Sequence, residues 1–198
     1  MCEVNKDHVL IRLRDVLPES GEGSLLNNLN PWGMAEQLRF LTMWLIRIAP
    51  NCVVEVGTNR GYFGYWLCRV LSPGSFEYHT IDVAQQCSEV AEILEDEFNA
   101  KVTFIHGDAA VVLPITLEGL GKPVDIGYVD GYHDYNACSG NLLDFGKANA
   151  RYILLDDCAP NTQMERALND FLASNSYAIL DRTDSIDDRG MVLIGRTT

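Results

Sequence analysis

The fold of this chain is decided by the stretch CVVEVGTNRGYFG, which covers residues 52–64. Its first five residues are apolar apart from Glu55, as expected for a parallel strand that is covered on both faces. Gly57 and Gly61 follow, where a backbone without side chains can turn sharply and approach a ligand. Helical spacing of apolar residues begins at Tyr62. The stretch predicts a strand, a glycine turn and a helix, as in nucleotide-type sites of α/β proteins.

The rest of the chain alternates between apolar runs that fit strands and segments with helical spacing. Strands are expected at residues 52–57, 77–82, 102–106, 125–130, 152–156, 178–181 and 191–194, and helices at 34–48, 62–71, 88–99, 109–118, 135–148 and 161–174. This alternation predicts an α/β fold with a doubly wound, mostly parallel sheet. The last two strands are separated only by a polar loop, which predicts a hairpin.

The composition restricts the class of protein. The chain has 198 residues, which suits one domain with its own core. Its 28 acidic and 15 basic residues give a net charge of −13, which argues against nucleic acid as a partner. The six cysteines lack the spacing of a zinc site and are expected to be free thiols. With no signal-peptide pattern and no apolar run of membrane-spanning length, we expect a cytoplasmic protein without a membrane partner.

Acidic residues end or follow each of the first five predicted strands: Glu55, Asp82, Asp108, Asp130 and the pair Asp156–Asp157. Ligands of open parallel sheets bind beyond the carboxyl ends of the strands, so we expect these acids at one edge of the sheet. Any single acid there could instead cap the next helix. Five in register favour a ligand site.

The glycine turn has a family resemblance. An acid two residues before the first glycine, in the pattern E-x-G-x-x-x-G, resembles motif I of the class I S-adenosylmethionine-dependent methyltransferases. The dinucleotide fingerprint G-x-G-x-x-G has a central glycine that this chain lacks. The resemblance implies an S-adenosylmethionine site built from Glu55, Gly57, Thr58, Asn59, Gly61, Asp82, Val83, Asp108, Ala109 and Asp130, with Asp82 at the ribose and Asp108 and Ala109 at the adenine.

The same resemblance implies the architecture. A single Rossmann-like domain over residues 34–198 is expected, with a seven-stranded sheet in the order 3-2-1-4-5-7-6, strand 7 antiparallel, and helices on both faces. Residues 1–33 are expected to form an N-terminal segment, with a short helix over 9–17 and a substrate lid that includes residues 27–33. Trp32 and Met34 are candidates to cover the cofactor, although such residues more often belong to the core. The loop at 183–190 is a further lid candidate.

A second resemblance concerns the chemistry. The pattern D-G-x-H-x-Y at residues 130–135, with Asp156–Asp157 after the next strand, resembles the metal-dependent O-methyltransferases of the catechol type and their macrolide and aminocoumarin sugar relatives. It implies that Asp130, Asp156 and Asp157 hold Mg²⁺ or another divalent cation, which prefers oxygen ligands. Such a cation lowers the pKa of an acceptor hydroxyl. The alternative is that the pair Asp156–Asp157 only caps the helix from residue 161.

His133 is the expected general base. It resembles the histidine base of the macrolide sugar enzymes, and an unperturbed histidine titrates near neutral pH. Catechol-type relatives place a lysine in this loop, and the present chain has none between Pro123 and Gly146. Asp134 is a second candidate, either as base or as a partner that orients His133.

The sequence thus predicts an S-adenosylmethionine-dependent, Mg²⁺-dependent O-methyltransferase that acts on a small-molecule hydroxyl. Three alternatives remain open: a methyltransferase of the same fold without a metal, a nicotinamide-dependent oxidoreductase that uses residues 55–82 as half of a dinucleotide site, and a binding module without catalysis. A homodimer is also left open, because no feature of the sequence decides it.

Overall fold

The computed structural model describes residues 34–72, 75–183 and 190–197. Its helices are α2 (Met34–Ile48), α3 (Tyr62–Leu71), α4 (Ser88–Phe98, preceded by the 3-10 turn Gln85–Cys87), α5 (Ala109–Gly119), α6 (Tyr135–Lys147) and α7 (Gln163–Ser174). Its strands are β1 (Cys52–Val56), β2 (Glu77–Asp82), β3 (Lys101–His106), β4 (Ile126–Val129), β5 (Tyr152–Leu155), β6 (Tyr177–Arg182) and β7 (Val192–Arg196). Each expected strand and helix in the described residues is present, with bounds that differ from the expected ones by two residues at most.

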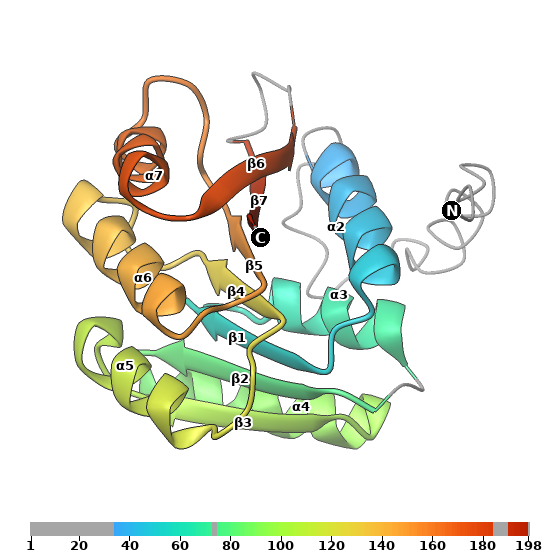
Figure 1. Cartoon of the computed structure of the whole chain (residues 1–198). Coiled ribbons are helices and arrows are strands. Elements are labelled where there is room, and N and C mark those ends of the chain that lie inside the picture. The colour runs from blue at the N-terminus through green and yellow to red at the C-terminus, as the bar shows by residue number, and fades with distance from the viewer. Residues whose placement is uncertain (1–33, 73–74, 184–189, 198) are drawn as a thin grey trace.

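The strands form one seven-stranded sheet in the order β3-β2-β1-β4-β5-β7-β6 (Figure 1). The first five strands in the chain pair in parallel. β7 is antiparallel to both of its neighbours, β5 and β6. The expected order and the antiparallel strand 7 are therefore confirmed.

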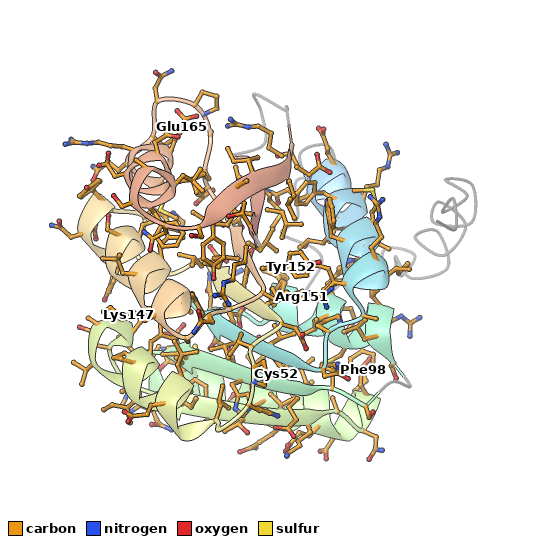
Figure 2. The ribbon with its side chains drawn as sticks, viewed as in Figure 1. Cys52, Phe98, Lys147, Arg151, Tyr152 and Glu165 are labelled. Carbon is orange, nitrogen blue, oxygen red and sulfur yellow. The ribbon has the colours of Figure 1, made fainter. Side chains whose placement is uncertain are left out.

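Helices cover the sheet on both faces, with α5, α6 and α7 on one face and α2, α3 and α4 on the other (Figure 1). Alternate residues of the central strands supply the two cores: Val54 and Val56 of β1 face the first helix layer, whereas Val53 faces the second. This period of two is what a strand covered on both faces requires. In Figure 2 the labelled Cys52 and Tyr152 mark the amino ends of β1 and β5.

The helix starts settle which acids act as caps. Asp108 caps α5 by accepting the N–H of Ala110 at 3.0 Å. Asp134 caps α6 by accepting the N–H groups of Asn136 and Ala137. α7 begins two residues later than expected and is capped by Thr162. The alternative that Asp156–Asp157 caps this helix is therefore wrong.

Some expectations lie outside the described residues. They concern the segment 1–33, with its short helix at 9–17 and its lid, and the interior of the loop at 184–189. The cysteines in the described part of the chain are free, as expected. None of the helices that the structure describes is long and apolar enough to cross a membrane.

Candidate cofactor and catalytic site

A cavity of about 330 Å³ opens at the carboxyl ends of the parallel strands, a size typical of small-molecule sites. Its lining includes many residues that the sequence singled out: Gly57, Asn59, Asp82, Val83, Asp108, Ala109, Asp130 and His133. The turns after β1, β2, β3 and β4 each supply part of this wall, and the start of α6 completes it. Of the acids expected at this edge of the sheet, Asp82, Asp108 and Asp130 line the cavity, whereas Glu55, Asp156 and Asp157 do not.

The turn between β1 and α3 depends on its glycines. Gly57 has a φ of 100°, and a Cβ there would lie 2.0 Å from the carbonyl oxygen of Asp130. Gly61 has a φ of 76°, and a Cβ there would meet the side chain of Val90 at 2.2 Å. Both positions combine a left-handed backbone with no room for a side chain, which only glycine tolerates. The turn therefore packs against the turn after β4 and against α4.

Asp82 ties together the turns that follow β1 and β2. Its Oδ2 accepts the N–H of Asn59 at 2.9 Å, and its Oδ1 accepts the N–H of Ala84 at 2.8 Å. Each carboxylate oxygen has a second lone pair, so the group can still accept hydrogen bonds from a ligand in the cavity. Paired hydroxyls such as those of a ribose match this acceptor.

One end of the cavity is formed by the turns after β2 and β3. Asp108 and Ala109 lie on its wall, where Asp108 also caps α5. The His106 Nε2 lies 3.0 Å from the carbonyl oxygen of Val83 and so joins the two turns. The capping role of Asp108 is confirmed, and its contact with an adenine stays a prediction.

The opposite end of the cavity holds a histidine between two carboxylates. The Nδ1 of His133 lies 2.5 Å from Asp157 Oδ2, and its Nε2 lies 3.4 Å from Asp130 Oδ1. Hydrogen bonds to Asp130 and Asp157 raise the pKa of His133 to about 10, against a partial desolvation that lowers it. The expectation that this histidine titrates near neutral pH does not hold for this arrangement, because two anions stabilise the imidazolium.

Asp156 is held by three donors behind this pair. Its Oδ2 accepts the hydroxyl of Tyr128 at 3.0 Å, and its Oδ1 accepts the N–H of Asp157 at 2.9 Å and the Nε2 amide of Gln37 at 3.4 Å. Burial, followed by the negative charge of Asp130, raises the pKa of Asp156 to about 7. Three carboxylates therefore gather after β4 and β5, and they repel one another.

The chemistry of this donor set suits Mg²⁺, which prefers carboxylate oxygens. As the side chains lie, no three of the Asp, Glu, His and Cys groups in the described residues converge on a position that could hold a metal ion. The positive group between Asp130 and Asp157 is the His133 imidazolium. A metal at these acids would require His133 to turn away from at least one of them.

Three of the expected cofactor residues, Glu55, Thr58 and Gly61, do not line the cavity. Glu55 and Thr58 are almost fully buried, at 1% and 2% exposure, and neither lines the cavity. Glu55 accepts hydrogen bonds from Tyr78 and Thr80. Burial raises the pKa of Glu55 to about 8. The structure thus separates residues that can touch a ligand from those that support the turn.

Several residues of the site had not been singled out from the sequence, among them four with polar side chains. Tyr132 and Asn136 line the cavity, while Tyr128 and Gln37 hold Asp156. Tyr128 could have been noticed as a polar tip in an apolar strand two residues before Asp130. Gln37 lies 119 residues before its partner, and nothing in the sequence marks that contact.

Several solved structures share this fold. The O-methyltransferase from Bacillus cereus, in complex with S-adenosylhomocysteine (SAH), has a TM-score of 0.64 and 18% identity, covering 97% of this chain and 90% of that chain. The O-methyltransferase TomG from Streptomyces achromogenes, involved in tomaymycin synthesis and bound to S-adenosylmethionine, has a TM-score of 0.62 and 18% identity, covering 100% and 92%. The SAH-bound methyltransferase PaMTH1 from Podospora anserina has a TM-score of 0.62 and 17% identity, covering 97% of this chain and 87% of that chain.

At these identities the likeness shows the fold alone. A search of curated protein sequences finds no match. A protein family described as "Methyltransferase domain" matches residues 54–158, just over half of the chain, from β1 to the residue after Asp157. This match spans the glycine turn and the acids at the strand ends, and it favours a methyltransferase over a nicotinamide-dependent oxidoreductase. The chain therefore belongs to this methyltransferase-domain family.

Proposed function

We propose that this protein transfers the methyl group of S-adenosylmethionine to the oxygen of a small-molecule hydroxyl. One observation carries the proposal: a single cavity joins the glycine turn, Asp82 and Asp108 to the pair Asp130 and His133. The first group provides the polar contacts that an adenosyl ligand needs. The second group, an acid and a histidine, is proposed to lie beside the acceptor hydroxyl when it meets the methyl group of the cofactor.

The cofactor half is proposed to act by recognition. Asp82 accepts hydrogen bonds from the two ribose hydroxyls, and Asp108 binds the adenine together with the backbone of Ala109. When bound, S-adenosylmethionine supplies a methyl group on a positively charged sulfur, and the new C–O bond forms as the C–S bond breaks. The carboxylate of Asp130 at the cavity wall stabilises that positive charge before transfer. Most of the rate gain in such a displacement comes from holding the two reacting atoms in line.

His133 is proposed to take the hydroxyl proton after its ring has left Asp130 and lost the Nε2 proton to solvent, because the imidazolium held between the two carboxylates has no free lone pair. Its two ring nitrogens are held unequally, since the contact with Asp157 is 2.5 Å and the contact with Asp130 is 3.4 Å. The longer contact is the one that opens, so that Nε2 faces the acceptor. Asp157 then keeps Nδ1 in place and fixes the tautomer, as an orienting carboxylate does for a base.

A divalent cation is the second part of the proposal. Asp130, Asp156 and Asp157 would hold it, and it would lower the pKa of the acceptor hydroxyl. The support is the gathering of three carboxylates, with the pKa of Asp156 raised by burial and by Asp130. Once His133 has turned toward the acceptor, a cation relieves the repulsion among these acids.

Titration calorimetry tests the cofactor. We expect SAH and S-adenosylmethionine to bind the wild type while NAD gives no heat. Asp82→Ala should raise the Kd for SAH by about tenfold or more, since it removes a charged hydrogen-bond acceptor. Asp96→Ala, at an exposed acid of α4, is the matched control and should bind as the wild type does.

A mass-spectrometric screen of small hydroxyl compounds then tests the reaction, with SAH release as the common readout. Methylated oxygen in any product supports the proposal. Heat from NAD, or none from either adenosyl ligand, would reject it.

A further inference from the structure

Beneath the glycine turn, four buried side chains form one continuous chain of hydrogen bonds. Tyr78 and Thr80 of β2 both donate to the Oε2 of Glu55 on β1. The hydroxyls of Thr80 and Thr58 lie 2.6 Å apart. Thr58 belongs to the turn itself, and the exposed fraction of each of the four is 2% or less. A buried polar chain with all members satisfied holds its geometry firmly.

The direction of each hydrogen bond follows from counting protons. Thr80 has one hydroxyl proton, and it goes to Glu55. The bond between Thr80 and Thr58 must then use the proton of Thr58, because a hydroxyl donates only once. The register places Thr80 directly opposite Glu55 on the neighbouring strand. The hydroxyl of Thr58 is thus tied to the sheet through Thr80 and Glu55.

Gly64 makes room for this chain. A Cβ at Gly64 would lie 2.8 Å from the hydroxyl oxygen of Tyr78 and 2.8 Å from its ring. The three glycines of the pattern G-x-x-x-G-x-x-G therefore have different protein neighbours: Asp130 for Gly57, Val90 for Gly61 and Tyr78 for Gly64. The third glycine of the pattern lies in α3 and leaves room for the side chain of Tyr78.

The anchored threonine sets the part of the turn that faces the cavity. Its carbonyl accepts the N–H of Gly61 at 2.7 Å and closes the turn. The next residue, Asn59, has a φ of 45° and gives its N–H to Asp82. Both Asn59 and Asp82 line the cavity, whereas Thr58, Glu55 and Tyr78 do not. A shift of Thr58 would move Asn59 and release one bond to Asp82.

We propose that Tyr78 is a positioning residue for the cofactor: it fixes the turn through Glu55, Thr80 and Thr58 and so sets the affinity for the adenosyl ligand without touching it. The inference rests on the proposed function, because it presumes that the cavity binds S-adenosylmethionine. It assigns Glu55 a supporting role in place of the direct cofactor contact expected from the sequence.

The test compares Tyr78→Phe with Tyr177→Phe by calorimetric titration with SAH, well below the melting temperature of either variant. Tyr177 also has a buried hydroxyl, which donates to the carbonyl of Ala150 at the amino end of β5, away from the cavity. We expect Tyr78→Phe to raise the Kd for SAH about tenfold, the scale of one lost buried hydrogen bond. Tyr177→Phe should lower the melting temperature and leave the Kd unchanged.

A second pair of variants probes the other end of the chain and decides the matter if Tyr78→Phe fails to fold. Thr58→Val should weaken SAH as Tyr78→Phe does, and Thr58→Ser should restore wild-type affinity because it keeps the hydroxyl. In the double variant with Tyr78→Phe, Thr58→Val should raise the Kd for SAH by a smaller factor than it does alone, as expected for residues that act through one network.

Wild-type affinity in Tyr78→Phe or in Thr58→Val overturns the inference, as does an equal loss in Tyr177→Phe. A wild type that binds no SAH rejects the proposed function itself, so the two failures are distinguishable.

Discussion

The Cβ position of Gly57 lies 2.0 Å from the carbonyl oxygen of Asp130, so the turn after β1 rests directly on the turn after β4. Gly57, which begins the glycine turn, and Asp130, which follows β4, therefore cannot move independently. We expect Gly57→Ala to push these turns apart and to strain a φ of 100°. SAH binding should be lost and the melting temperature should fall, as measured by calorimetry and scanning fluorimetry.

The control for that variant is Gly119→Ala. Gly119 ends α5 and has no atom within 4 Å of its Cβ position. Alanine there should be neutral or slightly stabilising. Tight SAH binding by Gly57→Ala would show that the backbone relaxes without cost to the site.

The proposed base predicts a loss of rate without a loss of affinity. His133→Ala should reduce kcat by about 10²-fold or more, since general-base catalysis contributes on that scale. The Kd for SAH should stay within about twofold, because the contacts assigned to the ribose and adenine come from the turns after β1, β2 and β3. Single-turnover kinetics with calorimetry checks both values, and an unchanged rate would remove His133 from the mechanism.

Metal dependence is tested by chelation. We expect EDTA to abolish turnover, Mg²⁺ to restore it, and the Kd for SAH to change little. Asp157→Asn should weaken the response to Mg²⁺. Asp134→Asn is its matched control, because asparagine also caps a helix and Asp134 serves as the cap of α6. Full turnover in EDTA would remove the cation from the proposal.

Glu55 predicts a pH dependence of stability. Burial raises its pKa from an ordinary 4.5 to about 8 in the folded protein, so between these values the folded state holds a proton that the unfolded state has lost. The stabilisation is full below about pH 4.5 and is lost as the pH rises through about 8. Glu55→Gln removes this loss, on the order of 5 kcal/mol at the upper end of the window.

Melting temperatures of the wild type and Glu55→Gln from pH 5 to pH 9 check this prediction. The wild type should lose stability relative to the variant as the pH rises. Parallel curves would mean that Glu55 is already ionised in the folded protein at pH 5.

Much of the fold was predictable because its periodicity is strong. β1 reads as a buried strand, and the acids at positions 82 and 130 end β2 or follow β4, as expected. The order of the strands came from the resemblance, since periodicity alone does not order them. The ends of elements were harder to predict. α7 starts after Thr162, because the hydroxyl of Thr162 caps the helix and the acids Asp156 and Asp157 do not.

The directions of side chains could not be predicted from the sequence. Glu55 looked like a cofactor contact because it precedes Gly57 by two residues, but its side chain points to Thr80 and Tyr78 on the neighbouring strand. His133 looked like a free base, and only the approach of the turns after β4 and β5 shows it between two carboxylates. Such contacts depend on register and on turns that meet in space, which no local pattern encodes.

The division of the cavity between strand ends has a consequence for how such a protein can diversify. The turns after β1, β2 and β3 supply Asn59, Asp82 and Asp108 to its lining, whereas the turn after β4 supplies Asp130 and His133. Asp157, after β5, contacts His133 without lining the cavity. On the proposed function, substitutions in the second set change the acceptor or its activation while the donor end stays intact. The two sets meet where Gly57 packs against the carbonyl of Asp130. We therefore expect Gly57 to tolerate substitution least as the residues after β4 diverge.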